Sequence, residues 1–273
     1  DKSARKLSKL IQQKKLSPLA LTRAYLDRIE KFEPYLSSYI TVCADLALET
    51  AREAEEKLMN NNKVGLLHGL PMGVKDQINT KGVRTTLGSK TFADNYPDCD
   101  ATVVKKAKRE GAILLGKLNM TEFAIGLGDP FKYGDPRNPW DHKRSAAGSS
   151  TGSAIAIASS LCAVSLGEDT GGSIRFPASV CGIVGLRPTV GRVSRSGVWP
   201  VSWSMDTVGP MTKTVEDAAM VLSAIAGSDS SDPLIANTKT PDYSRALDDD
   251  IKGIKIGVIS ELFDKSFTNS EVY

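Results

Sequence analysis

Serine and glycine are concentrated in one short part of the chain, in a pattern that favours nucleophilic chemistry. The stretch from Ser145 to Arg175 contains eight serines and five glycines. Two serine-bearing turns, Gly148-Ser149-Ser150 and Gly171-Gly172-Ser173, lie toward its two ends. Glycine lets main-chain N–H groups approach a ligand closely, and such groups beside a serine can form an oxyanion hole. A flexible linker is the alternative, but the apolar run Ala154–Ala158 between the turns argues against it.

A serine nucleophile needs a base, and Lys75 is the candidate. It lies in the apolar, strand-like run Gly69–Asp76, where a lysine is out of place. Burial there would lower the pKa of the amine, because burial penalises the charged form, and a lowered pKa makes lysine a usable base near neutral pH. The alternative is that the side chain reaches past the apolar surface to solvent.

A different serine chemistry is suggested by Gly148-Ser149-Ser150-Thr151-Gly152, which matches the G-x-S-x-G nucleophile elbow with Ser150 as nucleophile. That chemistry needs a histidine after the serine, and both histidines, His68 and His142, precede it. A histidine beyond the end of this sequence would be required. We expect His68 and His142 to be surface or packing residues.

Two further patterns suggest a ligand at first sight but lack the residues that such a site needs. The segment Gly111–Leu118 resembles a phosphate-binding loop, but Leu118 stands where a Ser or Thr should bind magnesium, and the apolar residues between the glycines indicate a strand. The acidic clusters Asp98-Cys99-Asp100 and Asp248-Asp249-Asp250 lack a calcium-loop pattern. We expect no nucleotide, no metal and no cofactor.

The elements that must position these residues alternate between strand-like and helical patterns from Gly65 onward, which predicts an α/β fold with a sheet between helices. Strands are expected at 113–115, 163–166, 183–186 and 254–259, and helices at 102–110, 150–160 and 214–226. Residues 1–62 are expected to form a helical N-terminal layer, with a basic amphipathic helix, a helix that begins at Ser17-Pro18, and a helix over 44–59. Residues 63–273 are expected to form the α/β catalytic core of the same domain. Because a new strand is expected near the end of the chain, we predict that 1–273 is incomplete at the C-terminus.

Composition excludes several classes of protein. The chain has 273 residues, with 35 Lys and Arg against 32 Asp and Glu, for a net charge of +3. This small charge gives no reason to expect direct binding of nucleic acid. The uncharged stretch from Ser145 to Gly167 is too rich in serine and glycine for a membrane span. Four cysteines do not form a disulfide framework, which favours a reducing compartment such as the cytoplasm.

Taken together, the motifs resemble the amidase signature family over roughly residues 65 to 225. The segments that carry the resemblance are Gly69–Asp76, Gly116–Phe123, Arg137–Asp141, Gly148–Ser153, Asp169–Arg175 and Cys181–Thr189. The resemblance implies a mixed β-sheet core with helices on both faces, and hydrolysis of a carboxamide without a metal or organic cofactor.

The resemblance also implies a catalytic triad. Ser173 would be the nucleophile, Ser149 the bridging serine after a cis peptide, and Lys75 the base that accepts a proton through Ser149. Asp169 and Arg175 would brace the loop. Main-chain amides would form the oxyanion hole around Thr170, Gly171, Gly172 and Ser173.

Three positions depart from the family's usual pattern. The family usually has glycine where Ala147 and Thr151 stand, so extra side chains beside Ser149 would narrow the site. It commonly has serine or another small residue where Glu168 stands, which adds a carboxylate beside Asp169.

Three functions remain open at this point. A free-standing amidase would act on a small-molecule amide, with a homodimer as one possible assembly. A glutaminase A subunit of an aminoacyl-tRNA amidotransferase would release ammonia for a partner protein. An inactive binding or scaffold protein would retain only the fold. The segments Asp135–Trp140 and Ser202–Ser204 favour the free-standing enzyme.

Overall fold

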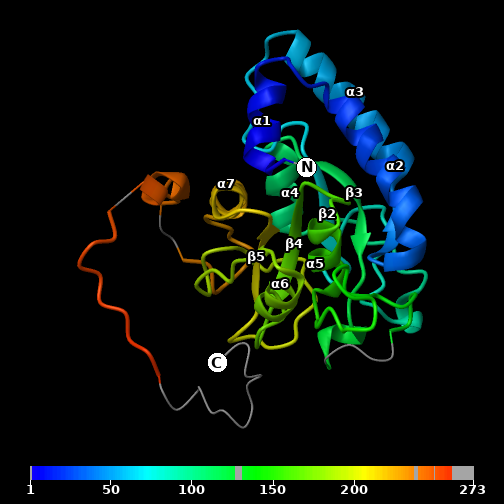
Figure 1. The fold of residues 1–273 in the computed structure, drawn as a ribbon, viewed down its shortest axis with the longest axis vertical. Helices are drawn as coiled ribbons and strands as arrows, with labels where there is room; N and C mark the ends of the chain where they lie inside the picture. The colour runs from blue at the N-terminus through cyan, green and yellow to red at the C-terminus, as the bar shows by residue number, and fades with distance from the viewer. Residues whose placement is uncertain (1, 127–130, 237–238, 249, 260–273) are drawn as a thin grey trace.

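Six strands form one mixed sheet at the centre of the molecule (Figure 1). The computed structural model describes residues 2–126, 131–236, 239–248 and 250–259. The strand order is β1-β3-β2-β4-β6-β5. Strand β2 pairs in parallel with β3 and β4, whereas β1, β5 and β6 pair antiparallel with their neighbours. The strands are β1 (Tyr39–Val42), β2 (Pro71–Lys75), β3 (Ile113–Leu118), β4 (Val164–Asp169), β5 (Val184–Gly185) and β6 (Thr207–Thr212).

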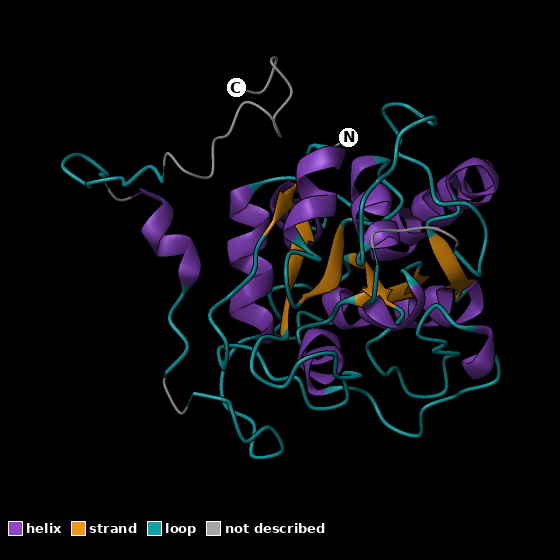
Figure 2. Ribbon diagram, turned by 90° about the horizontal axis from the view of Figure 1, so that it is seen from below, coloured by secondary structure: helices purple, strands orange, loops and turns teal. Residues whose placement is uncertain are grey.

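Helices lie on both faces of this sheet (Figure 2), as the sequence predicts. The long helices α2 and α3 pack against each other along one side of the fold (Figure 1). The α-helices are α1 (Ala4–Gln12), α2 (Pro18–Leu36), α3 (Ala44–Met59), α4 (Thr102–Arg109), α5 (Thr151–Ala158), α6 (Arg175–Cys181) and α7 (Val215–Ile225). Short 3-10 helices span Lys90–Phe92, Glu122–Ala124 and Tyr243–Asp248.

Local capping explains where the predicted helices begin. The Ser17 hydroxyl accepts the N–H of Ala20 at 3.0 Å, and Pro18 fills the first helical position of α2. The Thr214 hydroxyl accepts the N–H of Asp217 at 3.2 Å and starts α7. The helices expected over 44–59, 102–110, 150–160 and 214–226 are all confirmed, with ends that shift by at most two residues.

The central strands are buried along their whole length, so any polar side chain on them needs a partner. Lys117 on β3 shows this clearly. Its amine donates to the carbonyl of Ile78 at 2.6 Å and to the Thr85 hydroxyl at 2.7 Å, and it lies 3.7 Å from the Asp76 carboxylate. Burial lowers its pKa to about 8, although Asp76 opposes the shift. Lys117 is therefore part of the core, which confirms that Gly111–Leu118 contains a strand.

Strands β1 and β6 and helix α6 were not expected from the sequence. Strand β1 carries the N-terminal part of the chain into the sheet beside β3, so residues 1–62 supply more than a layer of helices. Strand β6 contains Gly209 and Pro210, residues that usually argue against a strand. Helix α6 has only seven residues and includes Pro177. Weak local propensity explains why β6 and α6 were not recognised from the sequence.

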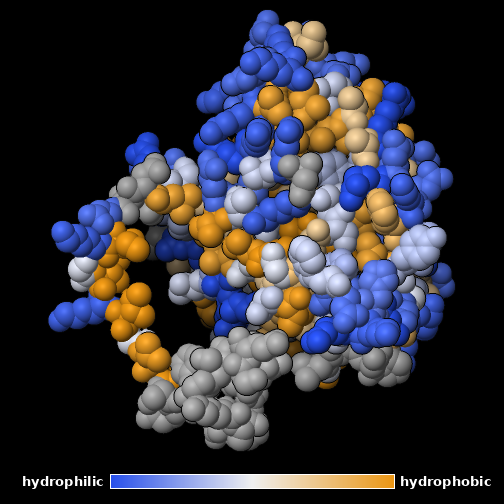
Figure 3. Space-filling model, in the orientation of Figure 1, coloured by the Kyte–Doolittle hydropathy of each residue, from blue (hydrophilic) through white to orange (hydrophobic). Residues whose placement is uncertain are grey.

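The strand expected over 254–259 is wrong. Residues 250–259 run away from the body of the fold (Figure 1), and their apolar side chains are exposed (Figure 3), with Ile256 at 86%. Within the described residues no strand pairs with this segment, so it has no ladder to join. The residues 260–273, expected to continue the unit, lie outside the described part of the chain.

The described part of the chain contains no helix that is both long and apolar enough to cross a membrane. The uncharged stretch that begins at Ser145 folds instead into the turn before α5, the buried helix α5 and most of strand β4.

Helix α5 approaches the sheet so closely that Gly152 has no room for a side chain. A Cβ at this position would overlap the carbonyl of Ser38 and the backbone of Asn119. We therefore expect Gly152→Ala to lower the free energy of unfolding by about 1–3 kcal/mol, as overpacking does, measured by urea unfolding. Gly257→Ala, where a Cβ meets open space, is the control. An unchanged midpoint for Gly152→Ala would contradict the packing described.

Candidate active site

Lys75 ends strand β2 inside the protein, where its side chain is fully buried. Its amine lies 2.7 Å from the Ser149 hydroxyl, 3.1 Å from a carboxylate oxygen of Glu168, and 3.2 Å from the Glu168 carbonyl. Because β2 and β4 pair in parallel, their carboxyl ends meet at the same edge of the sheet. This pairing brings Lys75 and Glu168 together.

Burial is the main influence on the Lys75 amine and lowers its pKa. The carboxylates of Glu168, Asp169 and Asp206 act in the opposite direction, yet the net pKa stays below that of an ordinary lysine. The side chain does not reach solvent, so the alternative expected for a lysine in an apolar run is wrong. An amine with a lowered pKa, in contact with a hydroxyl, can accept that hydroxyl's proton.

The turn before α5 holds Ser149 against Lys75. The Gly148–Ser149 peptide is cis, as the resemblance implies. Ala147 has a positive φ of 55°, a left-handed conformation that glycine adopts more easily. The Thr151 hydroxyl donates to the Ala147 carbonyl at 2.7 Å. The two departures from glycine at 147 and 151 therefore contact each other in the turn.

The second serine turn lies directly against the first. The N–H of Ser150 donates to the carbonyl of Ser173 at 3.1 Å. Ser173 is partly exposed, whereas Ser149 is 1% exposed. A partly exposed serine in the turn that adjoins a buried serine suits a nucleophile that meets substrate and a serine that passes its proton inward.

Ser150 is buried, and its hydroxyl makes structural hydrogen bonds. Its side chain is fully buried, and its hydroxyl donates to the Glu168 carbonyl at 3.1 Å and accepts the Glu168 N–H at 3.3 Å. It thereby fastens the start of α5 to β4. The two histidines lie elsewhere: His68 is buried with its Nε2 2.9 Å from the Ala54 carbonyl, and His142 is exposed. In the described part of the chain the Ser150 hydroxyl bonds to backbone groups of Glu168 and not to a histidine, so the nucleophile-elbow interpretation still needs a histidine from outside this sequence.

Asp169 organises the turn that leads to Ser173. Its carboxylate accepts the N–H groups of Gly172 at 2.8 Å and Ile174 at 3.1 Å, and it pairs with the Arg175 guanidinium at 3.0 Å. Burial acts to raise its pKa, but these hydrogen bonds hold the pKa below its usual value. Arg187, which the sequence analysis missed, also contacts the carboxylate at 3.1 Å and donates to the Asp169 carbonyl. Asp169 and Arg175 brace the loop, as expected.

Gly172 differs in part from its expected role. Its N–H is donated to Asp169, so in this conformation that amide is not directed at a substrate. Its φ is +139°, and a Cβ would overlap the Phe176 ring. Glycine is therefore required here for the shape of the turn, beside the amides of Thr170, Gly171 and Ser173.

Glu168 and Asp206 form a buried acidic pair that the sequence analysis did not assign to the site. The Thr170 hydroxyl lies between them, 2.9 Å from Glu168 and 2.6 Å from Asp206. The N–H groups of Val201 and Ser202 hold the Asp206 carboxylate at 2.7 and 2.9 Å. Glu168 stands where the family commonly has a small residue, and this difference could have pointed to a role in the site. Nothing in the sequence placed Asp206 near Lys75.

A metal centre is not evident among the described residues, where no group of three or more His, Cys, Asp or Glu side chains is arranged to hold an ion. Asp100, from one of the acidic clusters, pairs instead with Lys108 at 2.9 Å. Part of the second cluster, at Asp249, lies outside the described residues.

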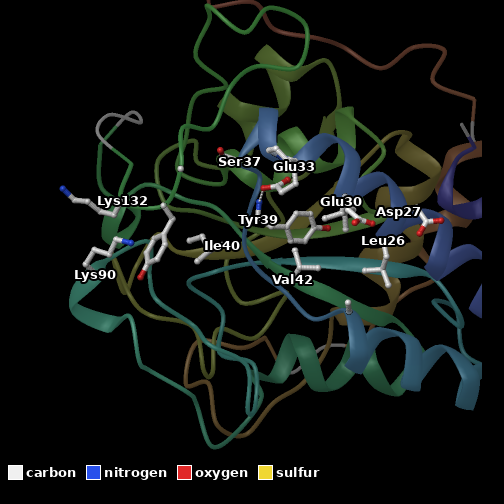
Figure 4. Close-up of a pocket in the computed structure, with 15 residues that line it drawn as sticks. Leu26, Asp27, Glu30, Glu33, Ser37, Tyr39, Ile40, Val42, Lys90 and Lys132 are labelled. Carbon is white, nitrogen blue, oxygen red and sulfur yellow. Dashed lines mark hydrogen bonds between the residues drawn. The ribbon is translucent and has the colours of Figure 1, made fainter.

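A separate cavity of about 780 Å³ lies beside the edge strand β1 (Figure 4). Glu33 lines it, and its carboxylate accepts the Ser38 hydroxyl and the Tyr39 N–H, both at 2.6 Å. Burial raises the pKa of Glu33 to about 7, although these hydrogen bonds oppose the shift. Lys90 and Lys132 lie across the cavity from Glu33 (Figure 4). Its lining does not include Lys75, Ser149 or Ser173.

Comparison with known proteins gives consistent matches. The amidase family profile covers residues 20–271. The A subunit of glutamyl-tRNA(Gln) amidotransferase from Gloeothece citriformis is 47% identical over 262 residues, which are 96% of this chain and 54% of that protein. The peptide amidase of Stenotrophomonas maltophilia superposes with a TM-score of 0.86 at 39% identity, over 91% of this chain and 53% of the other. The corresponding amidotransferase A subunit of Thermotoga maritima gives 0.75 at 38% identity, over 88% and 51%. The chain spans about half the length of the relatives it matches.

The bracing of the Ser173 loop by Asp169 predicts a pH-dependent loss of stability. Asp169→Asn leaves buried donors without an anionic acceptor, so we expect the free energy of unfolding at pH 7 to fall by about 1–3 kcal/mol. Because the pKa of Asp169 is lowered on folding, its contribution is present above about pH 4 and is lost as the pH falls through the folded pKa. The difference between wild type and variant should therefore narrow at acid pH.

Urea unfolding at pH 7 and pH 3 measures this difference. The control is Asp141→Asn, which removes a carboxylate from an exposed pair with Arg144 and should change little. Equal stability of wild type and Asp169→Asn at pH 7 would contradict a bracing role for Asp169.

Proposed function

This chain belongs to the amidase family, and we propose that it hydrolyses the C–N bond of a carboxamide through a covalent acyl-enzyme. The observation that carries the proposal is the contact of 2.7 Å between the fully buried amine of Lys75 and the Ser149 hydroxyl. A lysine in this position has a lowered pKa and a hydroxyl to deprotonate. The adjoining turn supplies Ser173 as the nucleophile.

In the proposed reaction, neutral Lys75 accepts the proton of Ser149, and Ser149 accepts the proton of Ser173. The Ser173 oxygen attacks the amide carbonyl to give a tetrahedral intermediate. The proton returns along the same path to the leaving nitrogen as the C–N bond breaks, and ammonia or an amine departs. Water then attacks the acyl-enzyme, with the same groups moving its proton, and releases the carboxylic acid. Every step uses the side chains of this chain and water.

The oxyanion of the intermediate would be stabilised by amides of the turn between β4 and α6. We assign this role to the N–H groups of Thr170, Gly171 and Ser173, with Gly172 required for the shape of the turn. Prearranged N–H donors stabilise charge that develops in the transition state, and removing one such donor typically costs about 10²–10³ in rate.

A second function has support from sequence identity. The relative from Gloeothece citriformis, 47% identical, carries the name of the A subunit of glutamyl-tRNA(Gln) amidotransferase. A protein of that kind would use the same triad on glutamine and pass ammonia to a partner protein. The peptide amidase superposes more closely than the Thermotoga protein, with TM-scores of 0.86 and 0.75. Structural superposition thus favours the peptide amidase, whereas sequence identity favours the amidotransferase subunit.

For both functions we propose a cytoplasmic protein that needs no cofactor. All four cysteines are unpaired, as is usual in a reducing compartment. The substrate would be a small amide rather than a nucleic acid. Ammonia release, measured over glutamine and over aliphatic and aromatic amides, would identify the substrate class.

The triad predicts large and non-additive losses of activity. Lys75→Ala should lower kcat/KM by about 10²–10⁴-fold, because it removes the base. Ser149→Ala should interrupt the path while leaving the nucleophile, and Ser173→Ala should abolish acyl-enzyme formation. The double variant Lys75→Ala, Ser173→Ala should be little worse than Ser173→Ala alone, since the residues act as a unit.

Steady-state kinetics on the best amide from the screen measure these losses. Asp141→Asn again provides a surface control. Near-normal turnover by Lys75→Ala at neutral pH, or losses that multiply in the double variant, would contradict the assignment of Lys75 as the base.

The two candidate functions predict different assemblies. A component of an amidotransferase should purify from its source in a stable complex with partner subunits and should show weak amidase activity by itself. A free-standing amidase should purify as a monomer or a homodimer with full activity. Size-exclusion chromatography with light scattering, applied to the protein from its source, distinguishes the two outcomes.

A further inference from the structure

Glu168 contacts the proposed base, but the reaction above does not use it. It is 1% exposed and lies on β4, next to the strand that carries Lys75. One of its carboxylate oxygens is 3.1 Å from the Lys75 amine, and its carbonyl oxygen is 3.2 Å from the same nitrogen. A buried ion pair of this kind needs a reason, because it adds little to stability over a well-packed apolar pair.

The partners of the Lys75 amine match the needs of a neutral amine. A neutral lysine has two N–H donors and one lone pair, and a base must aim the lone pair at the proton that it accepts. The two oxygens of Glu168 are acceptors for the two N–H groups. The third contact of the amine is with the Ser149 hydroxyl at 2.7 Å. With both N–H groups on Glu168, the lone pair is left for the Ser149 hydroxyl.

Charge gives Glu168 a second effect on Lys75. The carboxylates that face the Lys75 amine are Glu168 and Asp169 on β4, and Asp206 in the segment before β6. Asp169 is neutralised by Arg175 and Arg187, and Asp206 accepts two main-chain N–H groups. Glu168 has Lys75 itself as its cationic partner.

We propose that Glu168 is a positioning residue for the reaction: it directs the lone pair of Lys75 at Ser149, and its charge sets the pH range in which Lys75 accepts a proton. The proposal rests on the proposed function. Glu168 touches no reacting atom of the substrate and acts through Lys75.

Two substitutions separate orientation from charge. Glu168→Gln keeps an oxygen for Lys75 and turns an NH₂ group toward the Thr170 hydroxyl, which can then donate to Asp206. It removes the negative charge, so Lys75 should lose its proton at lower pH. Glu168→Met removes both the charge and the side-chain acceptor, so the amine should also lose its orientation.

The experiment is the pH dependence of the rate at which a fluorophosphonate probe labels Ser173. We expect the labelling rate to rise with pH as Lys75 loses its proton. For Glu168→Gln this rising limb of the pH–rate profile should move to lower pH by about one unit or more, the size of effect that a close opposite charge has on a titration. Its rate at high pH should stay near that of wild type. Glu168→Met should show the same shift and a high-pH rate reduced by about tenfold or more. Asp100→Asn, which removes a carboxylate paired with Lys108 outside the site, should leave the limb unmoved.

Each outcome decides the proposal. A merely structural role would lower the labelling rate equally at every pH and leave the limb in place, which would overturn it. A high-pH rate for Glu168→Met equal to that of Glu168→Gln would overturn the orienting role. If Glu168→Gln does not fold, as judged by circular dichroism, Glu168→Ser replaces it, and the rising limb of its pH–rate profile should also move to lower pH. Folded wild type that is unlabelled at every pH would overturn the proposed function itself, whereas labelled wild type with an unmoved limb would overturn only the role of Glu168.

Discussion

A lysine amine that is completely removed from water must either be neutral or have partners for its charge, and the site is arranged around this constraint at Lys75. Burial favours the neutral amine, while Glu168 at 3.1 Å favours the protonated one. Burial has the larger effect, so the pKa of Lys75 stays below that of a surface lysine. A second buried lysine, Lys117, has a structural role instead. Its amine donates hydrogen bonds to a carbonyl and a hydroxyl of the core and lies close to Asp76.

The sheet positions the side chains that the proposed reaction needs. Parallel pairing of β2 with β4 brings Lys75 to the same edge as Glu168 and Asp169. From that edge Asp169 organises the turn to Ser173, and Ser150 fastens the neighbouring turn to both β4 and Ser173. Small residues allow the close approach, because a side chain at 152 would overlap the backbone. The proposed triad is therefore assembled from three segments that are distant in sequence.

Much of this arrangement was predictable from the sequence, for identifiable reasons. Helix starts at Ser17 and Thr214 follow from local capping, and the strand at 113–115 follows from its apolar run. Lys75 was singled out because a lysine is anomalous in an apolar strand, and the two serine turns because glycine and serine are concentrated there. The roles proposed for Ser149 and Ser173 came from the resemblance to the family. What failed depends on long-range pairing: β6 contains glycine and proline, and the apolar segment at 254–259 has no described strand beside it. The contact between Lys75 and Glu168 depends on strand register, which the sequence does not show.

The central claim is that Ser173, activated through Ser149 by Lys75, carries the acyl group. The most direct test is to locate the covalent adduct that a fluorophosphonate forms with the folded protein. Ser149, Ser150 and Ser173 fall within one tryptic peptide, residues 145–175, so fragment-ion mass spectrometry must separate them. We expect a single adduct on Ser173, absent from Ser173→Ala and formed much more slowly in Lys75→Ala. An adduct on Ser150, or no adduct on the folded protein, would contradict it.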